Sequence, residues 1–178
     1  RQYLNLPDQY PAKLAFVGVG SHSISNLYPV LQYLGAPLKY IVTRNPQNAE
    51  GMARRFPKAS ATSDLQAVLA DEEVKGVLVC AAPSAHFALS KQILQAGKAL
   101  WVEKPICETA EQLDELRDLA GKLPVVVGLQ KRYATLYGPL EKAAKEGPGS
   151  YQLSYLTGAY PEGGILAELF IHPLDWLV

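Results

Sequence analysis

The stretch KLAFVGVGSHS, residues 13–23, decides the fold. It begins as a short apolar run rich in β-forming residues, and such a run ending in glycine is typical of a buried strand in a parallel sheet. The predicted strand, 13–19, leads directly into a glycine turn. A helical spacing of apolar residues follows over 24–34, where Pro29 predicts a kink or a later helix start. This order of strand, tight turn and helix opens a βαβ series.

The same alternation continues as far as residue 130. Further strands are predicted at 38–43, 74–82, 98–104 and 124–129, and further helices begin after the N-cap candidates Asn45, Ser63 and Thr109 and at residue 85. Strands joined by helices form parallel sheets through right-handed crossovers, with helices on both faces. The sequence therefore predicts an α/β fold over 1–130, a doubly wound parallel sheet of the Rossmann type.

The pattern changes after residue 130. A polar helix is predicted over 133–146, Gly147, Pro148 and Gly149 interrupt the chain, and a strand is predicted at 151–158. We interpret residues 131–178 as the beginning of an incomplete α+β second domain. Such a unit would expose a strand edge and an apolar helix face, so we expect either further C-terminal residues or a homo-oligomer.

Composition excludes several classes of protein. The chain has 17 Lys and Arg against 17 Asp and Glu, so we expect no general attraction to nucleic acid or to an anionic membrane. No apolar run approaches the roughly 20 residues that a membrane span needs, and we expect a cytoplasmic protein. Cys80 and Cys107 suggest neither a disulfide framework nor a metal site, and both are predicted to be reduced structural thiols.

The glycine turn is the first candidate binding site. Gly18, Gly20 and Ser23 occupy the positions of the dinucleotide fingerprint, in which glycines permit a tight turn and close approach of a pyrophosphate to a helix N-terminus. Ser23 replaces the third glycine; it is small enough for helix packing and its hydroxyl could donate to phosphate. We predict cofactor contacts from this turn, Ser21 included. A turn without a ligand is the alternative, and His22 is either a phosphate contact or a solvated residue.

The second strand predicts which dinucleotide binds. An NAD site usually offers a carboxylate there to the ribose 2′-hydroxyl, but residues 36–49 contain neither Asp nor Glu. Thr43 and Arg44 stand at the end of this strand instead. A guanidinium can hold a 2′-phosphate with paired, charge-assisted hydrogen bonds. NADP is therefore the favoured cofactor, with NAD as the alternative, and a solvated Arg44 is the other interpretation.

Four short motifs in order carry a resemblance to a known family. They are CAAPSAH at 80–86, GKALWVEKP at 97–105, GLQKRY at 128–133 and GGILAELFIHPLD at 163–175. Together they resemble the Gfo/Idh/MocA oxidoreductases, and the neighbourhood of Arg132 resembles the virulence-factor-like members. The resemblance implies a Rossmann domain for NAD(P), followed by a domain with an open sheet that supplies the substrate floor and an oligomer interface.

The resemblance also implies roles for individual residues. Lys104 would lie near the nicotinamide and the substrate oxygen, and His172 would relay a proton. Glu168 stands where the family usually has Asp, so its carboxylate is displaced by about one bond length. The resemblance further implies cofactor contacts from Pro83, His86 and Glu103 and substrate contacts from Arg132 and Asp175. For His86, a cap or packing role is an equal alternative.

The residues themselves support part of this assignment. Lys104 follows a predicted strand at its carboxyl end, where open α/β sheets bind ligands, although a surface lysine is the plain alternative. On a helix, Glu168, His172 and Asp175 fall within about 60° of one another. This stripe is either a functional face or merely the solvated face of an amphipathic helix. Pro173 predicts a kink or a later helix start there.

Together these features predict an NADP-dependent oxidoreductase that moves hydride between nicotinamide and a hydroxyl or carbonyl carbon of a small, sugar-like or cyclitol-like molecule. The substrate class follows from the resemblance alone. A dinucleotide-binding regulatory or structural protein without turnover is the alternative from another class. A redox-neutral enzyme that uses NAD(P) transiently is a third interpretation.

Overall fold

The computed structural model describes residues 12–56, 58–135, 137–146, 154 and 170–175. The chain divides into two compact units, Arg1–Val127 and Gly128–Val178. No helix in these described segments has both the length and the apolar character needed to cross a membrane.

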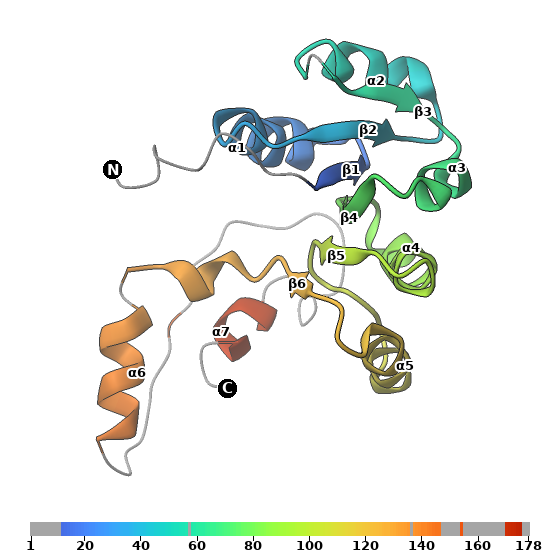
Figure 1. Ribbon diagram of the computed structural model, residues 1–178. Helices are drawn as coiled ribbons and strands as arrows, with labels where there is room; N and C mark the ends of the chain where they lie inside the picture. Colours follow the sequence, from blue (N-terminus) through green and yellow to red (C-terminus); the bar gives the residue numbers. More distant parts are fainter. Residues whose placement is uncertain (1–11, 57, 136, 147–153, 155–169, 176–178) are drawn as a thin grey trace. The chain divides into compact units, whose positions relative to one another are not determined.

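The first unit is built on a six-stranded parallel sheet in the order β3-β2-β1-β4-β5-β6 (Figure 1). The strands are β1 (Lys13–Val17), β2 (Leu38–Val42), β3 (Ser60–Thr62), β4 (Val74–Val79), β5 (Ala99–Val102) and β6 (Val125–Val127). From β1 the chain adds strands outward to β3, then returns to place β4 on the other side of β1. The carboxyl end of β1 therefore lies at a topological switch point, and the predicted Rossmann fold is confirmed.

Helices cover both faces of the sheet. They are η2 (Ser23–Leu27), α1 (Tyr28–Tyr33), α2 (Pro46–Ala53), α3 (Leu65–Ala70), α4 (Pro83–Gln95) and α5 (Ala110–Ala120). Alternate residues of β1 enter different cores: Phe16 packs with Tyr28 on one face, and Ala15 and Val17 pack with Ile93 on the other. The predicted two-sided burial follows from this alternation.

One strand was missing from the sequence prediction. β3, at the edge of the sheet, has only the residues Ser-Ala-Thr and no apolar run. It forms because Tyr40 to Val42 of β2 offer unpaired backbone groups, which Ser60 to Thr62 satisfy in register. Such a strand is specified by its neighbour rather than by its own residues, so no local pattern indicates it.

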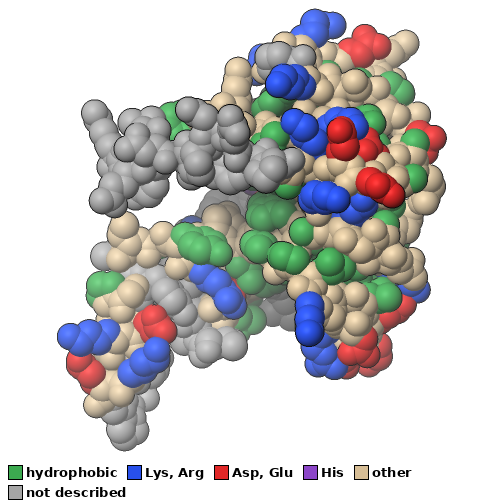
Figure 2. All heavy atoms as spheres, viewed as in Figure 1, with side chains coloured by type: hydrophobic (Ala, Val, Ile, Leu, Met, Phe, Trp, Pro, Cys, Tyr) green, Lys and Arg blue, Asp and Glu red, His purple; other side chains and the backbone are tan. Residues whose placement is uncertain are grey.

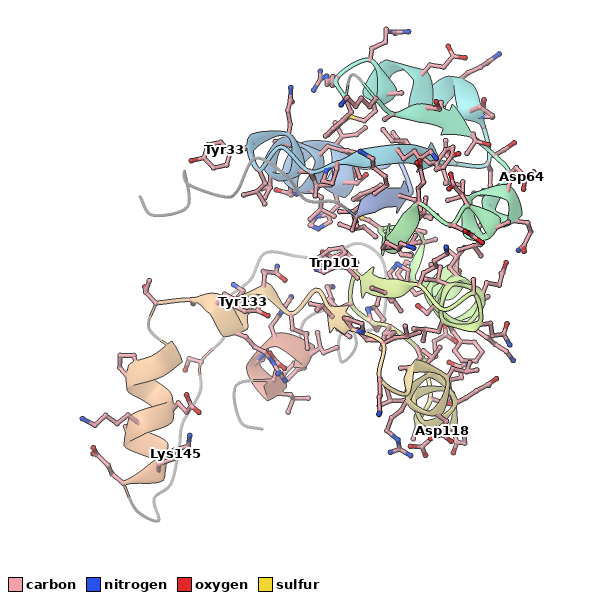
Figure 3. The ribbon with its side chains drawn as sticks, viewed as in Figure 1. Tyr33, Asp64, Trp101, Asp118, Tyr133 and Lys145 are labelled. Carbon is pink, nitrogen blue, oxygen red and sulfur yellow. The ribbon has the colours of Figure 1, made fainter. Side chains whose placement is uncertain are left out.

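The helix starts are mostly those predicted. The side chains of Asn45 and Thr109 accept hydrogen bonds from Gln47 N and Gln112 N as N-caps. Pro29 lies in the first turn of α1, which follows the π-helical turn η2, as the predicted late start requires. Ser63 was the wrong cap for α3. Asp64, which is labelled in Figure 3, caps α3 instead, and its Oδ1 accepts a hydrogen bond from Ala67 N at 2.9 Å. A carboxylate caps a helix as well as a serine hydroxyl does, so the helix begins one residue later.

The second unit is described over three short elements: η3 (Gln130–Tyr133), α6 (Tyr137–Lys145) and α7 (Ile171–Asp175). The polar helix predicted over 133–146 begins at Tyr137, after the 3₁₀ turn of η3. The predicted strand at 151–158 lies outside the described residues, apart from Ser154.

Basic and acidic side chains lie next to one another over much of the face shown in Figure 2. One cluster of opposite charges in the first unit is well defined: Lys39 Nζ lies 2.6 Å from Asp71 Oδ2 and 2.5 Å from Glu73 Oε2, and the Tyr40 hydroxyl donates to the same Asp71 oxygen. The hydrogen bonds that the Asp71 carboxylate accepts, first from Lys39 and then from the backbone N–H of Glu73 and the Tyr40 hydroxyl, lower its pKa from the ordinary 3.8 to about 2.

This shift predicts a specific acid sensitivity. Because the pKa of Asp71 is lower in the folded state, its carboxylate stabilises the fold above about pH 4, and this contribution disappears as the pH falls toward 2. We expect Asp71→Asn to lower the melting temperature at pH 6 slightly and to flatten its decline in acid, as measured by circular dichroism. The control is Glu72→Gln, whose carboxylate has no hydrogen bond or ion pair among the described residues. A decline of equal slope in both variants would contradict the assignment.

Candidate cofactor site

Gly18 is required by the fold itself. It follows β1 with φ 112°, in the region that favours glycine, and a Cβ built on it would lie 2.0 Å from the carbonyl oxygen of Cys80. Its own carbonyl accepts a hydrogen bond from the Tyr28 hydroxyl at 3.0 Å. The turn is therefore pressed against the end of β4, and no other residue type fits at this position.

Gly20 differs from Gly18 in a useful way. It is exposed, its φ lies outside the left-handed region, and a built Cβ would meet no atom within 4 Å. Nothing in the described fold therefore demands glycine here. A ligand that approaches the backbone closely would demand it, and that is the role of this position in a dinucleotide turn.

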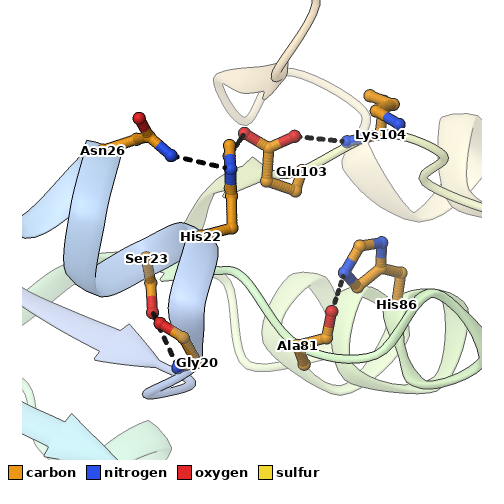
Figure 4. A network of polar contacts seen from close by, with 8 residues as sticks. All are labelled: Gly20, His22, Ser23, Asn26, Ala81, His86, Glu103 and Lys104. Atoms are coloured by element: carbon orange, nitrogen blue, oxygen red, sulfur yellow. Dashed lines mark hydrogen bonds and ion pairs between the residues drawn. The ribbon is translucent and has the colours of Figure 1, made fainter. Parts of the chain in front are cut away.

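Ser23 shapes the turn from inside. The side chain is fully buried, and its hydroxyl accepts from Gly20 N at 2.9 Å and donates to Gly20 O at 3.0 Å (Figure 4). The single hydroxyl proton is thus already used, so direct donation to phosphate does not fit this arrangement. Ser23 replaces the third glycine as a small packing residue, while Ser21 is exposed beside it.

Thr43 and Arg44 follow β2, which is the neighbour of β1, so they lie at the same carboxyl edge as the glycine turn. Thr43 N donates to the Thr62 carbonyl of β3 at 3.0 Å, which fixes the backbone here. The Arg44 side chain is exposed and has no hydrogen bond or ion pair with another described residue. A cation placed in this way remains available to a phosphate.

Glu103 and Lys104 follow β5 at this edge. The Glu103 side chain is 12% exposed; its Oε2 accepts from Lys104 N at 3.2 Å, and its Oε1 lies 3.3 Å from His22 Nε2 of the glycine turn. Lys104 is half-buried, and its peptide bond to Pro105 is cis. Glu103 thus stands between the glycine turn and the predicted catalytic lysine.

His86 lies in the interior beside the same edge of the sheet. It is 1% exposed, with Nδ1 2.7 Å from the Pro105 carbonyl and Nε2 3.0 Å from the Ala81 carbonyl. The ring ties the turn after β4 to the loop after Lys104, which favours the packing alternative, and its contact with a cofactor stays a prediction. Pro83 is the first residue of α4 and is exposed at the same edge.

Cys80 also belongs to the interior of this region. Burial, and then the charge of Glu103, raises the pKa of its thiol to about 11. The thiol stays protonated at neutral pH, and both Cys80 and Cys107 are free, as predicted. No group of His, Cys, Asp or Glu that could hold a metal ion occurs among the described residues.

The candidate substrate residues lie in the second unit. Arg132 Nε donates to Asp175 Oδ1 at 2.6 Å, and Nη2 lies 2.5 Å from the same oxygen. Both His172 and Asp175 are buried, at 6% and 7% exposure, whereas Leu174 between them is 53% exposed. These two residues of the predicted stripe therefore do not lie on a solvated face. Glu168 lies outside the described residues, and a joint action of Lys104 and His172 remains a prediction.

The contact between His22 and Glu103 was not predicted from the sequence. The available signal was the spacing of His22 and Asn26, one helical turn apart, whose side chains indeed meet at 3.1 Å. No spacing rule indicates a contact across 81 residues, so Glu103 could not be identified as the partner.

A glycine turn at the switch point of a parallel sheet, beside an available cation and a lysine, defines a dinucleotide-binding domain. Comparison with known proteins agrees: the family described as "Oxidoreductase family, NAD-binding Rossmann fold" (GFO_IDH_MocA) matches residues 12–131. The chain belongs to this Gfo/Idh/MocA family of oxidoreductases, which confirms the resemblance.

Individual relatives cover much of the chain. Inositol 2-dehydrogenase of Paracoccus denitrificans is 30% identical, across 93% of this chain and 54% of its own length. The scyllo-inositol 2-dehydrogenase (NADP(+)) IolW of Bacillus subtilis is 28% identical, across 60% of this chain and 31% of its own. The probable oxidoreductase yhhX, whose crystal structure is known, is 27% identical in sequence. The two structures match with a TM-score of 0.74 over 93% of this chain and 53% of the yhhX chain. The chain thus spans about half the length of such relatives, or less.

Proposed function

We propose that this chain carries the cofactor domain of an NADP-dependent oxidoreductase that acts on a CH–OH group or the corresponding carbonyl of a sugar-like or cyclitol-like molecule. The observation that carries the proposal is Gly20, an exposed glycine that the fold does not need and a pyrophosphate does. The names of two relatives, both inositol dehydrogenases, support a polyol substrate.

The residues of the chain have separate tasks in this proposal. Backbone groups of the turn from Gly18 to Ser21 approach the diphosphate, and Arg44 pairs with the 2′-phosphate. The bound nicotinamide supplies the hydride acceptor. The Lys104 side chain holds the substrate oxygen: its neutral amine accepts the hydroxyl proton during oxidation, and its ammonium returns a proton to the carbonyl oxygen during reduction. Thr43, Pro83 and Glu103 border the cofactor, and His172, Glu168, Arg132 and Asp175 act on the substrate side.

The cofactor preference gives the first test. We expect NADP to raise the melting temperature more than NAD does at equal concentration. The stabilisation by each dinucleotide should grow with the logarithm of the ratio of its concentration to its Kd. Arg44→Ala should weaken NADP binding about 10- to 100-fold, the loss of one or two charge-assisted hydrogen bonds, and should leave NAD binding unchanged. Arg55→Ala is the control, because it removes an exposed arginine that lies just after α2. Equal affinity of the wild type for both dinucleotides would overturn the role of Arg44.

A further inference from the structure

One side-chain contact joins two loops that are far apart in sequence. His22 belongs to the glycine turn after β1, and Glu103 follows β5. Their side chains meet at 3.3 Å between Nε2 and Oε1 (Figure 4). β1 and β5 are not neighbours, because β4 lies between them in the sheet. The contact therefore passes over the carboxyl end of β4 and connects the turn that approaches the diphosphate with the loop that carries Lys104.

The hydrogen bonds define which atoms donate. The Asn26 amide nitrogen, a donor, lies 3.1 Å from His22 Nδ1, so Nδ1 is the acceptor of this contact and Nε2 is the donor nitrogen of the ring. Nε2 then donates to Glu103 Oε1. The second oxygen of the carboxylate accepts from Lys104 N at 3.2 Å. Both oxygens of Glu103 are thus oriented, one from the glycine turn and one from the backbone of Lys104.

This arrangement contributes little to folding. The His22 side chain is 50% exposed, and contacts of exposed polar groups add little to the free energy of unfolding. Glu103, by contrast, is 12% exposed and directly precedes Lys104. A carboxylate that is held from both sides restricts the loop in which the lysine stands, and small displacements of a catalytic group lower turnover strongly.

We infer that His22 is a positioning residue: it holds Glu103 and, through it, sets the place of Lys104 relative to the bound dinucleotide. The inference rests on the proposed function. It assigns to the fifth position of the glycine turn a task in catalysis rather than in phosphate binding, and Asn26 supports that task by fixing the tautomer of His22.

Two variants separate this role from a structural one. His22→Leu removes the donor, and His22→Gln places an amide N–H at nearly the reach of Nε2. We expect His22→Leu to lower kcat about tenfold while the Kd for NADPH, from fluorescence titration, changes less than about threefold and the melting temperature stays the same. His22→Gln should restore kcat to within about threefold of wild type. In a Glu103→Gln background, the loss caused by His22→Leu should largely disappear.

The outcomes distinguish this inference from the proposed function. A wild-type protein that binds no NADP(H) or shows no turnover with polyols would overturn the proposed function and this inference together. A wild type that binds and turns over, with an unchanged kcat in His22→Leu, would overturn only the inference. It would equally be overturned by a His22→Gln as slow as His22→Leu, or by losses from His22→Leu and Glu103→Gln that simply multiply.

Discussion

Replacing Lys104 by alanine is expected to lower kcat for NADP-linked oxidation of a polyol by about 10²- to 10⁴-fold, the usual contribution of a positioned general acid or base. The cofactor should still bind, because the turn from Gly18 to Ser21 and Arg44 are untouched. We expect Kd for NADPH within about threefold of wild type. Steady-state kinetics and fluorescence titration on the same preparation measure both quantities.

Lys122→Ala is the matched control, since it removes an exposed lysine after α5 and leaves the sheet edge unaltered. It should change neither quantity. If Lys104→Ala kept wild-type turnover, the lysine would not be the proton-transferring group. If both the wild type and the variant bound NADP without any turnover, the interpretation as a dinucleotide-binding regulatory protein would be favoured.

The two glycines of the turn should respond to alanine in opposite ways. Gly18→Ala places a methyl group against the Cys80 carbonyl in a backbone conformation with positive φ. Strain and overpacking together should lower the free energy of unfolding by about 3 kcal/mol or more. Urea unfolding followed by circular dichroism measures the loss, and the variant should express poorly.

Gly20→Ala should fold as the wild type does, because its Cβ enters open space and alanine restricts the unfolded chain. NADPH affinity should nevertheless fall more than about tenfold, since the added methyl group occupies the place of the pyrophosphate. Each variant serves as the control for the other. A Gly20→Ala protein that binds NADPH as tightly as wild type would contradict the role assigned to this turn.

Much of the fold could be predicted from the sequence because its signals are local. Apolar runs such as that before Gly18 mark central parallel strands, and caps such as Asn45 and Thr109 mark helix starts. The glycine turn, Arg44 and Lys104 were predicted at one sheet edge because each follows the carboxyl end of a predicted parallel strand. β3 could not be predicted, because its three residues take their conformation from β2.

The site was less predictable where side chains meet over long sequence separations. His86 is buried, and both of its ring nitrogens lie beside backbone carbonyls. Its motif does not indicate this burial, so the packing role could not be predicted. Ser23 looked like a phosphate donor, but its hydroxyl closes the turn on Gly20. Arg132 and Asp175, each predicted to contact substrate, pair with one another across 43 residues.

The central claim is that the turn from Gly18 to Ser21 holds the diphosphate of NADP. A crystal structure of the protein grown with NADP tests it most directly. The account predicts diphosphate density against the backbone at Gly20, the 2′-phosphate at Arg44 and the nicotinamide ring beside Lys104. A dinucleotide bound elsewhere on the chain, or a nicotinamide remote from the lysine, would contradict it.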